Sequence, residues 1–355
     1  MNELEKYKTT PLQKLGRYKS LIIFAVIMAV LPFLGFNQYG IHVLIMMLFW
    51  AYMATSWSVL GGRLGHFAMG NGIYMALGAY ITGALYKYGN MTPWLGIILA
   101  GILSAVIAVI VSLPCFRLRG TYYSLATTAV LFIGKTLIVN NQFIFGLDFG
   151  GSLGFRIAYN KGFMNMAFKN KEPYYFIILG MFVIAMFVMI SLNYNKTGYY
   201  FSAIKTNQEA AEAAGVNTTL YKCIGQAICT FFTAAGGGFY MMFIMFLDPS
   251  RILVYALSIE ILLYAVVGGM ATTWGPAIGA IILYPLSEVL RVTFSDTGSL
   301  SKAIYALIFM LVVFFAPQGV QPALAKLLDK IGVTGFFAKI KSKLFKKTAA
   351  SEEVE

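Results

Sequence analysis

The chain has 355 residues, of which 59% are hydrophobic and only 12% are charged. A soluble domain carries about twice that share of charged residues, so most of this chain must have lipid rather than water as its solvent. The net charge of +13 would suggest nucleic-acid binding in a soluble protein. Here the basic residues lie mostly in short loops and tails, where they set orientation in a membrane, and we expect no nucleic-acid partner.

The first apolar run follows an N-terminal stretch of 20 residues that contains five Lys or Arg residues. It resembles a signal peptide, but no small-x-small cleavage site follows it, which favours a retained first transmembrane helix. About 20 apolar residues cross the hydrocarbon core as a helix. The apolar runs lie at about 20–36, 39–60, 65–86, 94–114, 121–140, 174–192, 223–247, 252–268, 275–291 and 301–317.

These runs predict an all-α integral membrane protein with about eight to ten transmembrane helices. The runs at 65–86 and 252–268 are the weakest, because they are Gly-rich or short. Each is therefore a candidate for a broken or re-entrant helix, with a full span as the alternative.

The distribution of Lys and Arg predicts that both termini are cytoplasmic. With alternating spans, 18 of the 27 basic residues fall on the inner side and eight on the outer side, while Lys135 lies inside a span. Cytoplasmic loops and tails carry such an excess, and an eight-span arrangement keeps the same ends. The predicted parts are a cytoplasmic tail at 1–20, a transmembrane domain at 21–320 with an external loop at 141–173 and a cytoplasmic loop at 193–222, and a cytoplasmic basic amphipathic tail at 321–355.

The most informative polar stretch is 202–216, within the cytoplasmic loop. Its alanines and glutamates favour a helix, and Gly215 is a suitable residue for the C-terminal end of that helix. A short helix on the inner face suits docking to a soluble partner. The alternative is an ordinary solvated loop helix.

Glu209, Ala210 and Ala211, with Gly215 six residues after the glutamate, resemble the EAA-x-x-x-G signature of ABC importer permeases. The later isoleucine and Leu-Pro of the longer signature are missing, as in the branched-chain amino acid branch. Other segments resemble the LivM-type permeases of that branch, in the right order over about residues 40–320: 61–70 (GGRLGHFAMG), 117–127 (RLRGTYYSLAT), 258–279 (SIEILLYAVVGGMATTWGPAIG) and 317–319 (PQG).

This resemblance implies an ABC importer permease that moves branched-chain or other hydrophobic amino acids across the bacterial inner membrane. It implies a LivH-like second permease, two cytoplasmic ATP-binding subunits and an external substrate-binding protein as partners, with the lipid bilayer as surroundings. ATP would be used by the partner subunits, so this chain would bind no cofactor itself. In the family the stretch with Glu209 docks the ATPase, which makes Glu209, Ala210, Ala211 and Gly215 the expected coupling residues.

Several residues at membrane depth are candidates for lining the translocation path. Glu260 is the only acidic residue clearly inside a predicted span, where a charge is costly unless it is paired or hydrated. It is either a pathway group or the structural partner of a nearby polar group. The full set of pathway candidates is Gly65, His66, Asn71, Thr127 and Glu260.

The sequence contains no catalytic constellation and no clustered metal ligands. The tripeptide at 134–136 (GKT) resembles the end of a phosphate-binding loop, but Ala129 stands where that loop needs glycine. We therefore expect a transport permease rather than an enzyme. The alternatives are a permease for urea, amides, sugars or nucleosides, and a self-sufficient channel or ion-coupled carrier. A carrier would place several ionisable residues in its spans.

Overall fold

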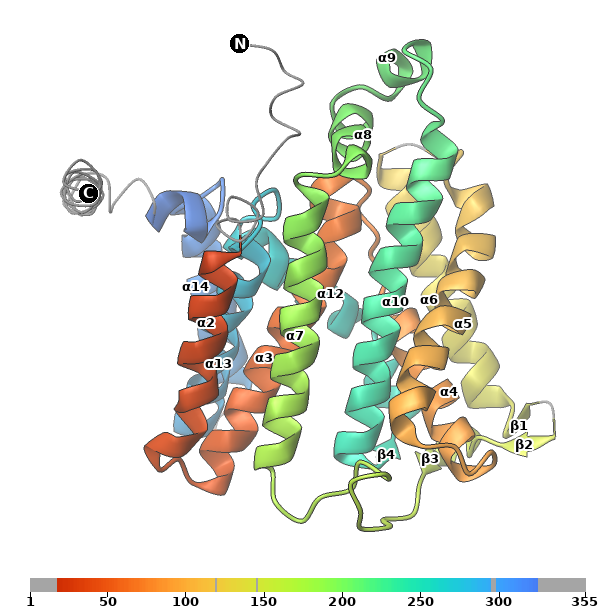
Figure 1. Ribbon diagram of the computed structural model, residues 1–355, viewed down its shortest axis with the longest axis vertical. Helices are drawn as coiled ribbons and strands as arrows, with labels where there is room; N and C mark the ends of the chain where they lie inside the picture. The colour runs from red at the N-terminus through yellow and green to blue at the C-terminus, as the bar shows by residue number, and fades with distance from the viewer. Residues whose placement is uncertain (1–17, 119, 145, 295–297, 325–355) are drawn as a thin grey trace, which may run out of the picture.

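The computed structural model describes residues 18–118, 120–144, 146–294 and 298–324. Helices dominate it, and Figure 1 shows most of them side by side as a bundle. In chain order they are α2 (Lys19–Val30), η2 (Leu31–Leu34), α3 (Gln38–Ser58), η3 (Val59–Arg63), α4 (Gly72–Lys87), α5 (Pro93–Cys115), α6 (Thr121–Asn140), η4 (Gly151–Leu153), α7 (Glu172–Leu192), α8 (Lys196–Thr206), α9 (Gln208–Ala213), α10 (Thr218–Ile244), α11 (Pro249–Ile252), α12 (Tyr255–Gly268), α13 (Gly275–Thr293) and α14 (Gly298–Phe315).

Two short antiparallel strand pairs join loops at one end of the bundle. β1 (Phe143–Ile144) pairs with β2 (Leu147–Asp148). β3 (Phe155–Arg156) pairs with β4 (Phe246–Leu247), so the long external loop is fastened to the end of α10. Strands of two residues are too short to leave an alternating pattern in the sequence, so the sequence does not predict them.

Local sequence signals fix several helix starts. The side chain of Asn37 accepts a hydrogen bond from Gly40 N at the start of α3, and Asn217 accepts one from Leu220 N at the start of α10. Both satisfy an N–H group that has no partner inside its own helix. Pro93 and Pro173 occupy the first turns of α5 and α7, where proline loses no helical hydrogen bond.

The predicted all-α membrane architecture is confirmed, since each of the ten apolar runs holds a helix. Seven segments in the described part of the chain are long and apolar enough to cross a bilayer: Gln38–Arg63, Pro93–Cys115, Thr121–Asn140, Glu172–Leu192, Thr218–Ile244, Pro249–Gly268 and Gly275–Thr293. The apolar helices at Lys19–Leu34 and Ala303–Val312, together with α4, are shorter.

The two weakest apolar runs are broken rather than continuous helices. Residues 64–71 are irregular and α4 begins only at Gly72. The later run is split between α11 and α12, with Leu253 and Val254 between them. The starts of α4 and α12 meet inside the bundle, where Gly72 N donates to Ser258 Oγ at 2.9 Å.

Two details differ from expectation. α10 begins at Thr218, so the cytoplasmic loop is shorter than 193–222. Glu288 also lies in a membrane-crossing helix, α13, where it pairs with Arg291 at 2.5 Å and accepts a hydrogen bond from Tyr39; Glu260 is therefore not the only acidic residue at such a position. Of the predicted tails at 1–20 and 321–355, all but residues 18–20 and 321–324 lies outside the described residues.

The helices fall into a layout in which α10 and α3 are central. α10 packs against α5, α4 and α3, and α3 also packs against α13, α7 and α12. α8 and α9 project from one end of the bundle, and the four strands lie at the other end (Figure 1). The excess of Lys and Arg predicts that the α8–α9 end faces the cytoplasm.

This orientation predicts opposite labelling of two exposed positions. We expect Glu209→Cys to react with a membrane-impermeant maleimide only after the cytoplasmic side is opened, and Asn160→Cys to react in intact cells with a permeable outer membrane. The background carries alanine or serine at Cys115, Cys223 and Cys229, which are unpaired by disulfides. Labelling of both positions from the same side would contradict the orientation.

Candidate functional site

The cytoplasmic loop folds into two short helices whose boundary is set by Asn207. Its side chain accepts a hydrogen bond from Ala210 N at 3.1 Å, which caps α9 just as α8 ends. α9 is then tied to the start of α10, because Thr218 Oγ1 donates to Glu212 Oε1 at 2.6 Å and Lys222 Nζ donates to Gln208 Oε1 at 2.8 Å. The loop is therefore a fixed projection.

The residues predicted to couple with an ATPase lie together on α9 and directly after it. Glu209 and Ala210 are exposed, while Ala211 is buried against a cluster that includes Phe201. Gly215 follows α9 with a φ of +86°, a left-handed conformation that glycine adopts at no steric cost. Glu209 and Ala210 are thus accessible on the outside of α9, while Ala211 anchors the helix to the protein.

A lysine of α8 adds a hydrogen bond to the apolar packing of Phe201 and Ile204 on the membrane domain. Lys205 Nζ donates to the carbonyl of Gly62 at 2.7 Å, within the turn η3 that continues α3. Burial of its ammonium group, and secondarily the charge of Arg63, lower the pKa of Lys205 from its usual value. A Cβ on Gly65 would lie 3.0 Å from Lys205 Cγ, and Gly65 has a φ of +77°. The Lys205 side chain therefore lies against the residues at which the helix formed by α3 and η3 ends and the irregular segment begins.

The end of η3 also contacts the turn between α12 and α13. Arg63 Nη2 donates to Thr273 Oγ1 at 3.0 Å, and Asn193 Nδ2 donates to the same oxygen at 2.9 Å. A Cβ on Gly62 would fall 2.0 Å from the carbonyl oxygen of Met270. We name this assembly the cytoplasmic joint: Gly62, Arg63, Asn193, Lys205 and Thr273.

The irregular segment 64–71 continues from the joint into the bundle, and neighbouring helices satisfy its polar groups. Trp57 Nε1 donates to the carbonyl of Ala68 at 2.8 Å, and Ser124 Oγ donates to the carbonyl of Phe67 at 2.6 Å. Met69 N donates to Thr127 Oγ1 at 3.1 Å. Non-helical backbone at membrane depth requires such partners.

Asn71 lies at the end of this segment in a buried polar cluster. Its Nδ2 donates to Thr233 Oγ1 at 3.3 Å, and Ser56 Oγ lies 3.0 Å from the same Thr233 oxygen. Cys229 Sγ is 3.6 Å from Asn71 Nδ2. The cluster joins α3, the irregular segment and α10, and all four side chains are buried.

A cavity of about 270 Å³ lies between the irregular segment and the start of α6. Gly65 and His66 line one side, and Tyr123 and Ser124 line another. The His66 ring makes edge contacts with Tyr123 and Phe116, at centroid separations of 5.2 and 6.2 Å. These contacts give His66 a packing role at the cavity wall.

Glu260 is separate from this group. Its Oε1 accepts a hydrogen bond from Tyr264 at 2.5 Å, one turn further along α12, and the Tyr264 ring packs against Trp50. This geometry supplies the structural partner that the sequence left open as one of its two interpretations.

The structure thus brings four of the five pathway candidates around one broken segment. Gly65, His66 and Asn71 are on it, Thr127 holds it, and Glu260 lies apart. Sequence reasoning missed residues that bind the same segment or the joint, although Ser124 and Ser258 lie inside the segments that carry the family resemblance. The missed residues are Ser56, Ser124, Asn193, Lys205, Thr233, Ser258 and Thr273.

Metal-ligand clusters are absent from the described part of the chain, where no three His, Cys, Asp or Glu side chains gather closely enough to hold an ion.

Comparison with known proteins agrees with the sequence motifs. A family model described as the permease component of branched-chain amino acid transport systems matches residues 40–313. The chain is similar to the high-affinity branched-chain amino acid transport system permease protein LivM of Salmonella typhimurium, with 24% identity over 85% of this chain and 74% of the relative. It is also similar to the LivM protein of Escherichia coli, with 25% identity over 75% of this chain and 66% of the relative. No solved structure matches the chain significantly.

The close contact between the irregular segment and α6 predicts the effect of a single methyl group. A Cβ on Gly70 would lie 1.9 Å from the carbonyl oxygen of Thr127, whereas a Cβ on Gly180 would meet no atom within 4 Å. We expect Gly70→Ala to lower the free energy of unfolding by about 1–3 kcal/mol. Gly180→Ala is the matched control and gains helix propensity. Thermal unfolding of the purified protein in detergent measures both, and equal midpoints for the two variants would contradict the packing.

Proposed function

The chain belongs to the family of permease components of branched-chain amino acid transport systems, and from this premise we propose that it forms one of two membrane subunits of an ATP-driven importer. It is a multi-pass protein of the bacterial inner membrane. We propose that ATP is bound and hydrolysed by two separate cytoplasmic subunits, and that an external binding protein delivers the substrate.

Branched-chain or other hydrophobic amino acids are the proposed substrates. Both curated relatives carry branched-chain amino acid transport in their names. Permeases for urea, short amides, sugars or nucleosides are the remaining alternatives, and the proposed delivery protein would decide between them. Uptake of labelled leucine, with urea as the comparison, separates these substrates.

The projection formed by α8 and α9 is the observation that carries the coupling proposal. It stands at the cytoplasmic end (Figure 1), exposes Glu209 and Ala210, and is fixed to α10 by the hydrogen bonds of Glu212 and Gln208. A rigid helix with an acidic outer face suits a groove in a soluble ATPase. Through Lys205 it also reaches the joint and the irregular segment.

We propose that α6 faces the second permease. Its most apolar window is only 28% buried, the smallest share among the seven long spans. Its exposed side chains include Thr136 and Leu125, and Lys135 is partly exposed, whereas α5 exposes aliphatic residues such as Ile102 and Ile110. Polar side chains at membrane depth face protein or a water-filled path more readily than lipid.

Co-purification tests the proposed assembly. We expect the tagged chain, extracted in mild detergent from its native membrane, to bring a second permease and ATP-binding subunits with it. Glu209→Lys reverses the charge of the docking face, so the ATPase subunits should be lost and uptake abolished while the chain stays folded. Asn160→Lys places the same side chain on the opposite end and should change neither result. A stable Glu209→Lys variant with normal uptake would contradict the coupling role.

Lys205 offers a sharper test, because it links the proposed docking helices to the turn η3 that precedes the irregular segment. Lys205→Met keeps the unbranched stem but removes the donor to Gly62. Since a hydrogen bond from a charged group contributes about 1.5–3 kcal/mol, uptake should fall about tenfold or more. ATPase subunits should still bind and hydrolyse ATP. Lys205→Arg retains donors and serves as the control.

The ratio of transport to ATP hydrolysis is the deciding measurement for Lys205→Met. A parallel loss of uptake and ATP hydrolysis would mean that Lys205 acts in binding the ATPase subunits rather than in passing their movement to the membrane domain. Unchanged uptake would mean that Lys205 has neither role.

A further inference from the structure

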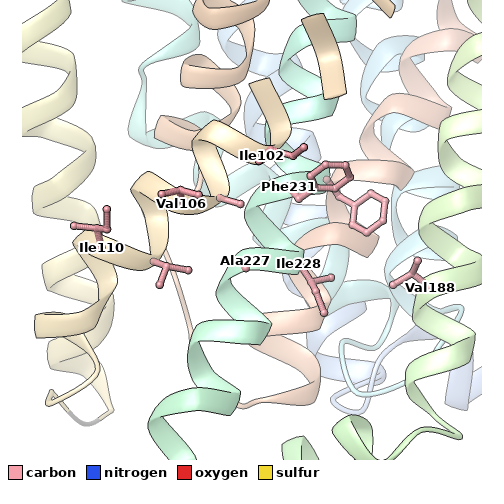
Figure 2. A pocket seen from close by; sticks show the side chains of 10 residues that line it. Ile102, Val106, Ile110, Val188, Ala227, Ile228 and Phe231 are labelled. Carbon is pink, nitrogen blue, oxygen red and sulfur yellow. The ribbon is translucent and has the colours of Figure 1, made fainter. Parts of the chain in front are cut away.

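The membrane face of the protein carries a groove whose lining side chains are all apolar. Figure 2 shows it between α5 and α7, with α10 between them. Its volume is about 600 Å³. The lining includes Ile102, Val106 and Ile110 of α5, Ala227 and Phe231 of α10, and Val188 of α7.

A second cavity lies about one turn further along α5 towards the cytoplasmic end, and its lining has a different chemistry. It measures about 520 Å³ and is lined by Leu113, Pro114, Phe116, Arg117 and Thr219. The α5 residues of both cavities include positions 102, 106, 110 and 113, which recur every three or four residues and so lie along one face of the helix. Arg117 follows directly after the end of α5.

The cytoplasmic end of this path suits an anion. Arg117 is exposed and follows the end of α5, and its guanidinium is a donor well suited to phosphate. Thr219 lies in the first turn of α10, where a hydroxyl and backbone N–H groups favour negative charge. Basic pockets between transmembrane helices on the cytoplasmic side bind anionic lipid headgroups.

We propose that the two cavities together bind one anionic glycerophospholipid of the inner leaflet. Its phosphate lies at Arg117 and Thr219, and an acyl chain runs along the groove past Ile110, Val106 and Ile102. The assignment to the inner leaflet follows from the cytoplasmic orientation of the α8–α9 end, and it does not depend on which substrate is carried.

The outer part of the space between α5 and α7 favours an acyl chain over a partner helix as the occupant. There a cavity of about 800 Å³ is lined by Trp94 of α5, Pro173 of α7, and Phe163 and Phe168 of the external loop. Trp94 Nε1 donates to the carbonyl of Phe163 at 3.0 Å, so the loop joins the two helices at their outer ends (Figure 1). A transmembrane helix needs about 20 residues to cross the core and would have to pass this loop, whereas an acyl chain ends within the bilayer.

Photolabelling of the full chain in vesicles tests the acyl-chain site. The vesicles contain phosphatidylcholine with a minor fraction of phosphatidylglycerol that carries a diazirine on one acyl chain. We expect labelling concentrated in peptides covering 102–110 and 227–232. Ala227→Trp fills the groove and should remove most of that label. Ile107→Trp places the same side chain on an exposed part of α5 outside the groove and should leave the label unchanged.

The headgroup site is tested with Arg117→Gln, a change at an exposed residue. We expect the preference for diazirine-labelled phosphatidylglycerol over equally labelled phosphatidylcholine to fall about fivefold, the effect of one basic residue near an anionic surface. Arg156→Gln, at an exposed position on the outer end, is the control. Labelling spread evenly over the exposed faces of α5 and α6, or an unchanged lipid preference in Arg117→Gln, would overturn the proposal. So would efficient cross-linking of Val106→Cys to another protein subunit.

Discussion

The absence of water from the bilayer interior is the constraint on which this structure depends. Every backbone N–H and C=O at that depth needs a partner within the protein, and residues 64–71 meet this demand without being helical. Trp57, Ser124 and Thr127 bind the segment from α3 and α6, and Ser258 receives the first N–H of α4. The irregular segment is stable because helices distant in the sequence supply its hydrogen-bond partners. Its conformation therefore depends on correct assembly of the bundle.

Small residues supply that assembly. A Cβ on Gly78 would fall 1.9 Å from the carbonyl of Ala234, and a Cβ on Gly237 would fall 1.9 Å from the carbonyl of Met75. The two helices α4 and α10 therefore approach each other through reciprocal glycines. In lipid, where apolar side chains gain nothing from leaving the solvent, such backbone contact is a main source of helix association. The same contact places Thr233 of α10 within reach of Asn71, so close packing and the polar cluster depend on each other.

The helices were predictable from the sequence because most apolar runs are long and the loops between them contain polar or Gly/Pro residues. It also reached the weak points at 65–86 and 252–268, since glycine content and shortness are visible locally. It did not reach the cytoplasmic joint. Lys205 is one basic residue among several in a cytoplasmic loop, and its bond to Gly62 joins positions 143 residues apart. The hydrogen bond from Tyr264 to Glu260 was out of reach for a related reason, because Tyr264 is an ordinary tyrosine until the helix register is known.

In the proposed coupling, the cytoplasmic joint would connect the projection formed by α8 and α9 to the interior of the membrane domain. Lys205 binds the carbonyl at the end of the π-helical turn η3, and a π-helical turn in an α-helix is a frequent functional irregularity. Arg63 and Asn193 converge on Thr273, which ties α3 and α7 to the turn between α12 and α13. A displacement of α8 must therefore either stretch the bond to Gly62 or move η3, and residues 64–71 begin where η3 ends. The irregular segment has no continuous helical hydrogen-bond ladder of its own, and it is bound by Trp57 of α3 and by Ser124 and Thr127 of α6. A displacement passed along it would therefore reach Asn71 and its partner Thr233 on α10.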